Sequence, residues 1–142
     1  MKTKQSPGTG AKRWMLVDDD EGALMFMRTF VSKLDVTEID CFKCAEDALA
    51  AFEAAPELFE LVITDFQMPG MDGVELSRRL LVRAPQIKIL LTTGSHLFND
   101  EVAAREGFSG FLKKPFQATA LQRALEAIAA GKFPAGSQRK TL

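Results

Sequence analysis

Polar side chains of the kind that handle phosphate follow several apolar runs of the sequence. Asp18 and Asp19 come directly after RWMLV, and Asp65 comes directly after ELVIT. Thr93 and Lys114 end two later runs, IKILLTT and GFLKK. Clustered carboxylates repel one another unless a cation or a proton intervenes, and their oxygens suit Mg2+. A Mg2+ ion beside an ammonium and a hydroxyl would neutralise a phosphoryl group, which leaves one carboxylate to act as nucleophile and form an acyl phosphate.

Each of these residues also has a simpler explanation when it is taken alone. Asp20 and Glu21 precede a segment with helical periodicity, so we expect them to be charge partners of a helix N-terminus. A single aspartate at a strand end is usually a turn or cap residue, and a threonine or lysine there is usually solvated. Because all these groups are expected at one edge of a sheet, a functional site explains them better than separate structural roles do.

Segments typical of strands and helices alternate five times along the chain. The predicted strands cover 13–17, 36–41, 60–64, 87–93 and 110–114. The predicted helices cover 21–34, 45–55, 73–84, 99–107 and 117–131. Apolar residues at helical spacing support the helices, and Pro56 and Pro85 end two of them. This alternation predicts an α/β fold, a parallel sheet with helices on both faces, whose strand ends meet at one edge.

The chain has 142 residues, and its length and composition fit one globular domain. We expect that domain to cover residues 13–131, between a flexible N-terminal tail (1–12) and a C-terminal tail (132–142). The net charge of −1 argues against direct nucleic-acid binding. No apolar run is long enough to span a bilayer, and no signal peptide is visible, so we expect no membrane association and a cytoplasmic location.

Two cysteines, Cys41 and Cys44, form a C-x-x-C motif, and His96 is the single histidine. Such a motif can be a redox pair or half of a zinc site, but a second pair is missing and the histidine lies far along the chain. We interpret the cysteines as two thiols at a strand–helix boundary. We expect His96 to be a solvent-facing loop residue, because it falls between the predicted strand 87–93 and the predicted helix 99–107.

The motifs LVDDDEG, VITDFQMPGMDG, LLTTG and GFLKKPF, in this order, resemble the receiver domain of two-component response regulators. The resemblance covers about residues 12–131, nearly everything except the tails. It implies a flavodoxin-like, doubly wound fold with a five-stranded parallel sheet of strand order 2-1-3-4-5.

The resemblance also implies roles for the acidic residues. Asp65 matches the phosphoacceptor of the family. Asp18 and Asp19 match its acidic pair, of which Asp19 would contact Mg2+ directly and Asp18 mostly through water. The backbone carbonyl of Gln67 would complete the protein ligands of the metal, together with Asp65.

Three further residues match positions that respond to phosphorylation. Lys114 matches the family lysine that pairs with the phosphoacceptor and later with the phosphoryl group, and Pro115 follows it as in the family. Thr93, chosen over its neighbour Thr92, matches the switch hydroxyl. Phe111 matches the switch aromatic, and without a hydroxyl it would act through packing alone.

The function implied is that of a phosphoacceptor in a two-component system or phosphorelay. A histidine kinase or a histidine phosphotransfer protein would donate the phosphoryl group to Asp65, and a surface made by helix 99–107, strand 110–114 and helix 117–131 would bind a downstream protein or a second copy. In the last helix, a stripe of small residues, Ala120, Ala124 and Ala127, would either support this contact or be present only because alanine is a good helix former; it lies beside a core stripe of Ala118, Leu121, Leu125 and Ile128. We expect a monomer or weak dimer, and no enzymatic role beyond assisting its own phosphorylation and dephosphorylation.

Three alternatives stay open at this point. The chain can be a receiver within a larger hybrid kinase or regulator. It can be an aspartyl-phosphate phosphatase of the haloacid-dehalogenase type, although Gln67 stands where that family needs a second acid. It can also be a receiver-like binding module that is never phosphorylated, against which the complete set of acidic, hydroxyl and lysine residues argues.

Overall fold

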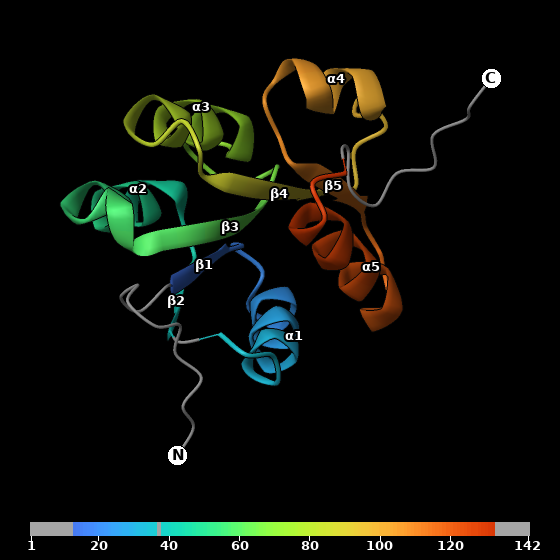
Figure 1. Ribbon diagram of the computed structural model, residues 1–142. Helices are drawn as coiled ribbons and strands as arrows, with labels where there is room; N and C mark the ends of the chain where they lie inside the picture. The colour runs from blue at the N-terminus through green and yellow to red at the C-terminus, as the bar shows by residue number, and fades with distance from the viewer. Residues whose placement is uncertain (1–12, 37, 133–142) are drawn as a thin grey trace.

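The computed structural model describes residues 13–36 and 38–132, which form a five-stranded sheet flanked by helices (Figure 1). The strands are β1 (Arg13–Val17), β2 (Glu38–Phe42), β3 (Phe59–Asp65), β4 (Lys88–Thr93) and β5 (Gly110–Lys113). They lie in the order β2-β1-β3-β4-β5, and every neighbouring pair is parallel. The predicted fold class and strand order are therefore confirmed. The predicted tails lie outside the described residues, apart from Lys132.

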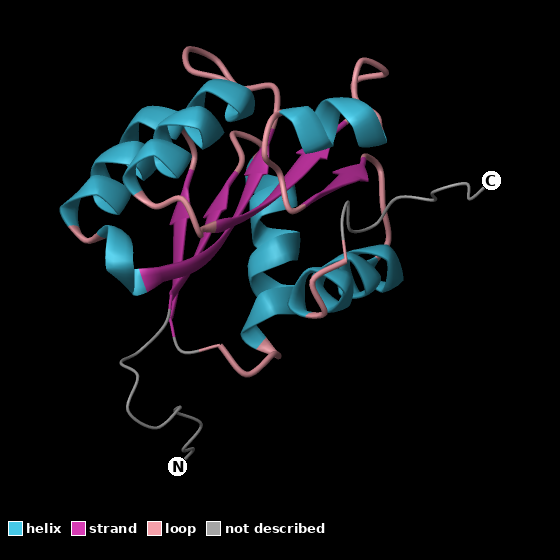
Figure 2. Ribbon diagram, turned by 45° about the horizontal axis from the view of Figure 1, so that its top comes forward, coloured by secondary structure: helices cyan, strands magenta, loops and turns pink. Residues whose placement is uncertain are grey.

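Helices cover both faces of the sheet, as the five-fold alternation predicts. They are α1 (Glu21–Ser32), α2 (Ala45–Ala54), α3 (Gly73–Arg83), α4 (Asp100–Arg105) and α5 (Ala118–Ala129), and a short 3-10 helix, η1 (Pro56–Leu58), precedes β3. Figures 1 and 2 show α1 and α5 on one face and α2, α3 and α4 on the other. None of the described helices has the length and hydropathy that crossing a bilayer requires.

The alternation of side chains along the strands divides the core into two clusters. Leu90 of β4 packs on the α1–α5 face, whereas its neighbours Ile89 and Leu91 pack on the α2–α4 face. In β3, Ile63 lies on the α1–α5 face and Val62 on the other. Successive strand residues point to opposite faces of the sheet. The face of each buried residue therefore also fixes the face on which the polar side chains at the strand ends lie.

Several element boundaries differ from the sequence prediction. Helix α1 ends at Ser32 rather than at residue 34, because the amide of Lys33 donates to Phe30 O and the chain turns, which leaves Leu34 exposed. Strand β2 begins at Glu38 rather than at residue 36, and α4 has only six residues. These differences arise at element ends, where local hydrogen bonds compete with the helix or strand pattern.

The predicted stripes on α5 are partly wrong. Ala124 is buried in the core with Leu121 and Ile128, whereas Ala118 is exposed and Leu125 only half-buried. The small side chain of Ala124 fills a fully buried position in the core of the α1–α5 face. It is therefore unavailable to a partner, and the stripe of small residues is not a continuous exposed surface.

Candidate functional site

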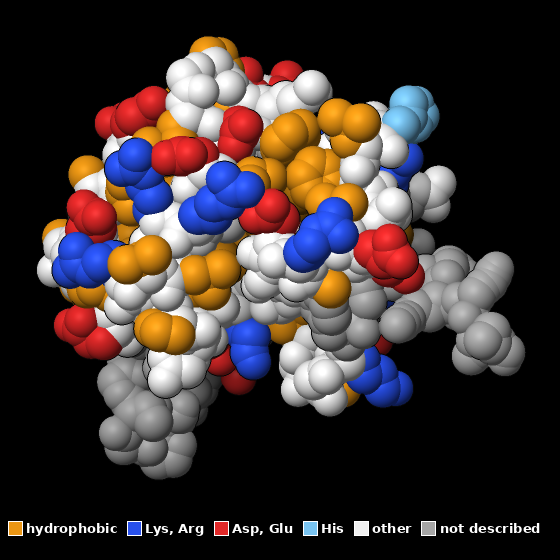
Figure 3. Space-filling view, turned by 90° about the horizontal axis from the view of Figure 1, so that it is seen from above, with side chains coloured by type: hydrophobic (Ala, Val, Ile, Leu, Met, Phe, Trp, Pro, Cys, Tyr) orange, Lys and Arg blue, Asp and Glu red, His pale blue; other side chains and the backbone are white. Residues whose placement is uncertain are grey.

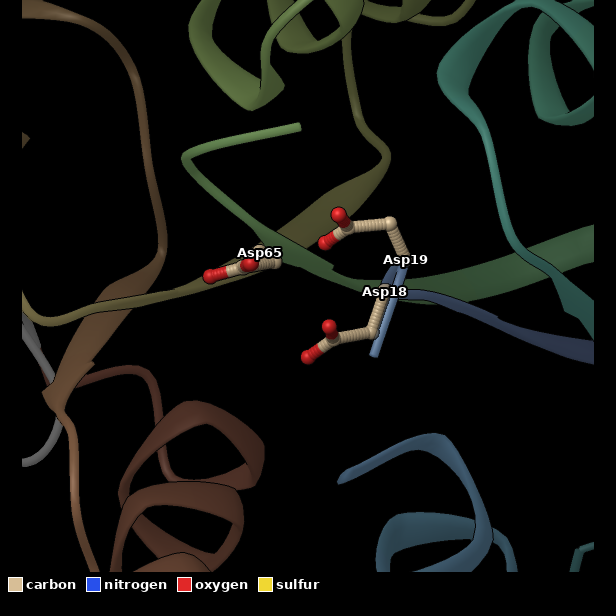
Figure 4. Close-up of side chains that lie close together, drawn as sticks. All are labelled: Asp18, Asp19 and Asp65. Atoms are coloured by element: carbon tan, nitrogen blue, oxygen red, sulfur yellow. The ribbon is translucent and has the colours of Figure 1, made fainter. Parts of the chain in front are cut away.

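Three aspartates come together at the carboxyl ends of β1 and β3. Asp65 is the last residue of β3, and Asp18 and Asp19 directly follow β1. One carboxylate oxygen from each residue lies within 4.8 Å of the others, and Figure 4 shows the three carboxylates turned to one side of the strand ends. Asp18 and Asp65 are buried, whereas Asp19 is exposed.

The register of the sheet explains why Asp18 and Asp65 meet. Val17 is the partner of Thr64, so the next residue of each strand reaches the same edge of the sheet. The amide of Asp20 donates to Asp18 Oδ1 at 2.9 Å and orients that carboxylate. Asp20 itself caps α1, where its Oδ2 accepts from the amide of Ala23 at 2.8 Å. The prediction that Asp20 belongs to the start of the helix is confirmed.

Lys114 connects the acidic cluster to β5. Its Nζ atom donates to Asp18 Oδ2 at 3.0 Å and lies 3.3 Å from Asp65 Oδ1. The sequence predicts the pairing with Asp65, whereas the shorter contact to Asp18 emerges only in the structure. The ammonium therefore holds two carboxylates that come from different strands.

The surroundings raise the pKa values of both Asp65 and Lys114. Burial raises the pKa of Asp65 and the charge of Asp18 raises it further, while the nearby Lys114 ammonium acts in the opposite direction. Burial alone would lower the pKa of Lys114, but its hydrogen bonds and charge interactions with Asp18 and Asp65 outweigh that effect and raise it. A crowded set of carboxylate oxygens beside a single ammonium suits a hard divalent cation. The residues present therefore fit Mg2+, which Asp18, Asp19 and Asp65 would hold.

The loop between β3 and α3 passes close to the backbone of Asp65 at Gly73. The amide of Gly73 donates to Phe66 O at 2.8 Å, and a Cβ atom placed on Gly73 would lie only 2.2 Å from Asp65 O. No larger residue fits there without moving the backbone of Asp65. Asp72 then starts α3, accepting from the amides of Val74 and Glu75 at 2.9 Å each. Gln67, a predicted metal ligand through its carbonyl, is an exposed residue of this loop.

Glu46 is a residue of the site region that sequence reasoning missed. From α2, its Oε2 atom accepts from the amide of Met71 at 3.0 Å and so fastens the same loop. That hydrogen bond lowers the pKa of Glu46. Gly70, with a φ of +79°, lies so close that a Cβ atom there would be 2.8 Å from Glu46 Oε2. No sequence motif predicts the contact between Glu46 and Met71, because these two residues are 25 positions apart and belong to different parts of the fold.

The predicted switch residues lie on the α2–α4 face of the sheet. Thr93 ends β4 and is fully buried, and its Oγ1 atom accepts from the amide of Ser95 at 2.9 Å. Phe111 is the β5 partner of Leu91 and packs, half-buried, against the core of that face. The two residues therefore lie on neighbouring strands, as predicted.

The cysteines and the histidine do not belong to the carboxylate cluster. Cys41 packs on the α1–α5 face, whereas Cys44 is the N-cap residue of α2, on the opposite face. His96 is an exposed residue of the β4–α4 loop. These positions agree with the interpretation of the cysteines as boundary thiols and of the histidine as a loop residue.

Residues 15–126 match the response regulator receiver domain family. The chain belongs to this family of two-component signalling domains. The receiver is 36% identical over 129 residues to the response regulator protein FleR of Pseudomonas aeruginosa, covering 90% of this chain and 27% of FleR. It is 30% identical over 118 residues to the chemotaxis protein CheY of Listeria monocytogenes, covering 81% of this chain and 96% of CheY. It thus spans about a quarter of the length of the first relative and nearly all of the second.

Solved structures place the receiver in the same fold. The signal receiver domain of an HD domain-containing protein from Pseudomonas fluorescens superposes with a TM-score of 0.75 at 27% identity, covering 89% of this chain and 93% of that one. The receiver domain of Ssk1 from Saccharomyces cerevisiae, crystallised with the histidine phosphotransfer protein Ypd1, gives a TM-score of 0.68 at 18% identity, covering 80% and 85%. The latter likeness shows the fold alone.

Proposed function

We propose that Asp65 is the residue that this receiver, spanning residues 13–131, uses to accept a phosphoryl group in the cytoplasm. The observation that carries the proposal is the meeting of Asp65 with Asp18, Asp19 and Lys114 at one sheet edge. An oxygen of Asp65 attacks phosphorus, the bond from phosphorus to the donor histidine nitrogen breaks, and an acyl phosphate forms. The displaced imidazole keeps the electron pair of that bond.

The surroundings of Asp65 favour this transfer by positioning and charge. The rigid end of β3 holds the carboxylate at the mouth of the site, and Lys114 keeps a positive charge beside it. Bound Mg2+ would neutralise charge on the phosphoryl oxygens. Asp18, Asp19, Asp65 and the carbonyl of Gln67 are the proposed ligands of that ion. The receiver is thus a substrate of its kinase that assists its own phosphorylation and dephosphorylation.

The donor is proposed to be a histidine kinase or a histidine phosphotransfer protein that docks beside α1. A cavity of about 450 Å³ opens next to the site, lined by Asp18, Asp20, Ala23, Phe26, Met27, Lys114, Pro115 and Phe116. The Phe26 and Phe116 rings lie 6.1 Å apart, and Phe26 is 41% exposed. An apolar surface at the edge of a charged site lets a helical partner bury area while its histidine reaches Asp65. Membership of the response regulator receiver family supports this class of partner.

Phosphorylation is proposed to change the surface formed by α4, β5 and α5. The Thr93 hydroxyl would move toward the phosphoryl group through a charge-assisted hydrogen bond, and Phe111 would turn into the space that it leaves. The altered surface would bind a downstream protein or a second copy more tightly. Figure 3 looks onto the side of the molecule that α2, α3 and α4 cover, where Lys and Arg side chains are interspersed with Asp and Glu, and such mixed charge suits a partner protein better than nucleic acid.

Incubation with acetyl phosphate and Mg2+, followed by intact-mass measurement, tests the proposal. The wild type gains one labile phosphoryl group, and Asp65→Asn, which is nearly isosteric, gains none. An Asp47→Asn control, on the exposed face of α2, behaves as the wild type. Continuous hydrolysis of acetyl phosphate without a stable adduct would favour a phosphatase instead, and an adduct on Asp65→Asn would contradict the assignment.

Amide exchange with and without beryllofluoride, a phosphoryl mimic, tests the output surface. Changes in residues 94–130 are expected if Thr93 and Phe111 carry the signal. Changes confined to the β3–α3 loop would rule out this route.

A further inference from the structure

Among the buried polar side chains of the described residues, the hydroxyl of Thr92 differs from the others in having no hydrogen-bond partner. Thr92 is fully buried, and its Oγ1 atom is the one buried side-chain nitrogen or oxygen in residues 13–36 and 38–132 without a hydrogen-bond partner. Its neighbour Thr93 accepts a hydrogen bond from Ser95. A buried hydroxyl without a partner costs folding free energy, since the unfolded chain satisfies it with water. Valine has nearly the same shape and carries no such cost.

The sheet places Thr92 beside the phosphoacceptor. Thr92 is the register partner of Asp65 on one side and of Leu112 on the other. Two positions earlier, Leu90 and Ile63 both pack on the α1–α5 face, so the side chains of Thr92 and Asp65 leave their strands on that same face. Thr93 emerges on the opposite face. The side chains of the two threonines therefore lie on opposite faces of the sheet at the end of β4.

The path of Lys114 brings a second charged group to Thr92. Lys114 follows β5, but its ammonium contacts Asp65 on β3 and Asp18 beyond β1. Strand β4 lies between β5 and β3, so the lysine side chain has to cross the end of β4. The last β4 residue on this face is Thr92. Thr92 is thus the residue at the end of β4 that this path crosses on the α1–α5 face.

We propose that Thr92 is a positioning residue whose hydroxyl gains its partner when Asp65 is phosphorylated. The inference rests on the function proposed above. In the acyl phosphate, one Asp65 oxygen binds phosphorus, and the ammonium of Lys114 is drawn toward the phosphoryl oxygens. The other Asp65 oxygen then becomes the acceptor for the Thr92 hydroxyl. A hydrogen bond made in only one of two states shifts the equilibrium toward that state.

Calorimetric titration with beryllofluoride in saturating Mg2+ tests this role in wild type, Thr92→Val, Thr92→Ala and Thr92→Ser. We expect the valine and alanine variants to bind the mimic up to about tenfold more weakly, the upper end of the range for one lost hydrogen bond to a neutral carbonyl oxygen. The serine variant keeps the hydroxyl and is expected to bind within about twofold of wild type. Mg2+ affinity without beryllofluoride should stay the same in all four proteins, because Thr92 is no ligand of the metal.

Thermal unfolding of the metal-free proteins supplies a readout that separates positioning from packing. Thr92→Val should unfold at a higher temperature than wild type, because the unpartnered hydroxyl is gone. Equal beryllofluoride affinity in Thr92→Val and wild type would overturn the inference, as would a lower unfolding temperature of Thr92→Val. Failure of the wild type itself to bind beryllofluoride would instead overturn the proposed phosphorylation of Asp65.

Discussion

Lys114 and Asp18 form a partly buried ion pair between residues 96 positions apart, with Nζ 3.0 Å from Oδ2 and the Asp18 side chain fully inaccessible. The same ammonium lies 3.3 Å from Asp65 Oδ1. In the metal-free protein, Lys114 is therefore the counter-ion of two carboxylates that a divalent cation would also bind. The lysine and the cation compete for the same oxygens, and this competition has measurable consequences.

Replacing Lys114 by methionine should destabilise the metal-free protein and strengthen metal binding. Two buried carboxylates lose their counter-ion, so we expect the free energy of unfolding at pH 7 to fall by roughly 2 kcal/mol, less than for a fully buried pair because Lys114 is 27% exposed. Mg2+ should bind roughly tenfold more tightly, since no ammonium competes for the oxygens. Chemical denaturation and calorimetry measure both effects. Lys113→Met, an exposed neighbour, is the control, and weaker Mg2+ binding by Lys114→Met would contradict the competition.

The stability of the metal-free protein should depend on pH through Asp65. Because the folded-state pKa of Asp65 is raised, the native protein holds this proton more tightly than the unfolded chain, and stability falls as the pH rises through that pKa. In EDTA at pH 7, Asp65→Asn should be more stable than wild type by roughly 1 kcal/mol. The difference should shrink as the pH falls toward about 4, the ordinary range of aspartate. Urea denaturation at several pH values measures it, and a constant difference at all pH values would exclude Asp65 as its source.

Asp19 and Asp20 should separate metal binding from helix capping. Asp19 belongs to the carboxylate cluster and is exposed, so Asp19→Ala should weaken Mg2+ binding roughly tenfold and leave stability nearly unchanged. Asp20 caps α1, so Asp20→Ala should lower the free energy of unfolding by about 1 kcal/mol and keep the Mg2+ affinity. Calorimetry and thermal unfolding of both variants measure these effects. Equal losses of Mg2+ affinity would show that the ligands are wrongly assigned.

Gly73→Ala should disturb Asp65, the proposed phosphoacceptor, without touching its side chain. The added methyl group would lie 2.2 Å from Asp65 O, so the loop or the end of β3 has to move. We expect a loss of about 3 kcal/mol in stability and slower phosphorylation by acetyl phosphate. Gly22→Ala in α1 is the matched control, because its Cβ would lie an ordinary 3.5 Å from Asp20 Oδ2. Normal phosphorylation and stability of Gly73→Ala would show that this loop adapts freely.

The alternation of strands and helices was predictable from the sequence because its signals are local. Apolar spacing, the prolines after two helices and the cap residues act over a few positions, and parallel strands necessarily bring their carboxyl ends to one edge. The juxtaposition of Asp18, Asp19, Asp65 and Lys114 follows from that rule. The motifs also predicted membership of the receiver family, and the match of residues 15–126 to that family confirms it.

Only the tertiary structure decided which long-range partners these residues have. Side-chain directions and loop paths decide that Lys114 lies closer to Asp18 than to Asp65. They also decide that Glu46 accepts a hydrogen bond from Met71 and that the hydroxyl of Thr92 has no partner. The burial of Ala124, predicted to be available to a partner, depends likewise on how α5 packs against the sheet. Such contacts join elements far apart in the chain, and their geometry is set by the packing of the whole core, which no local pattern records.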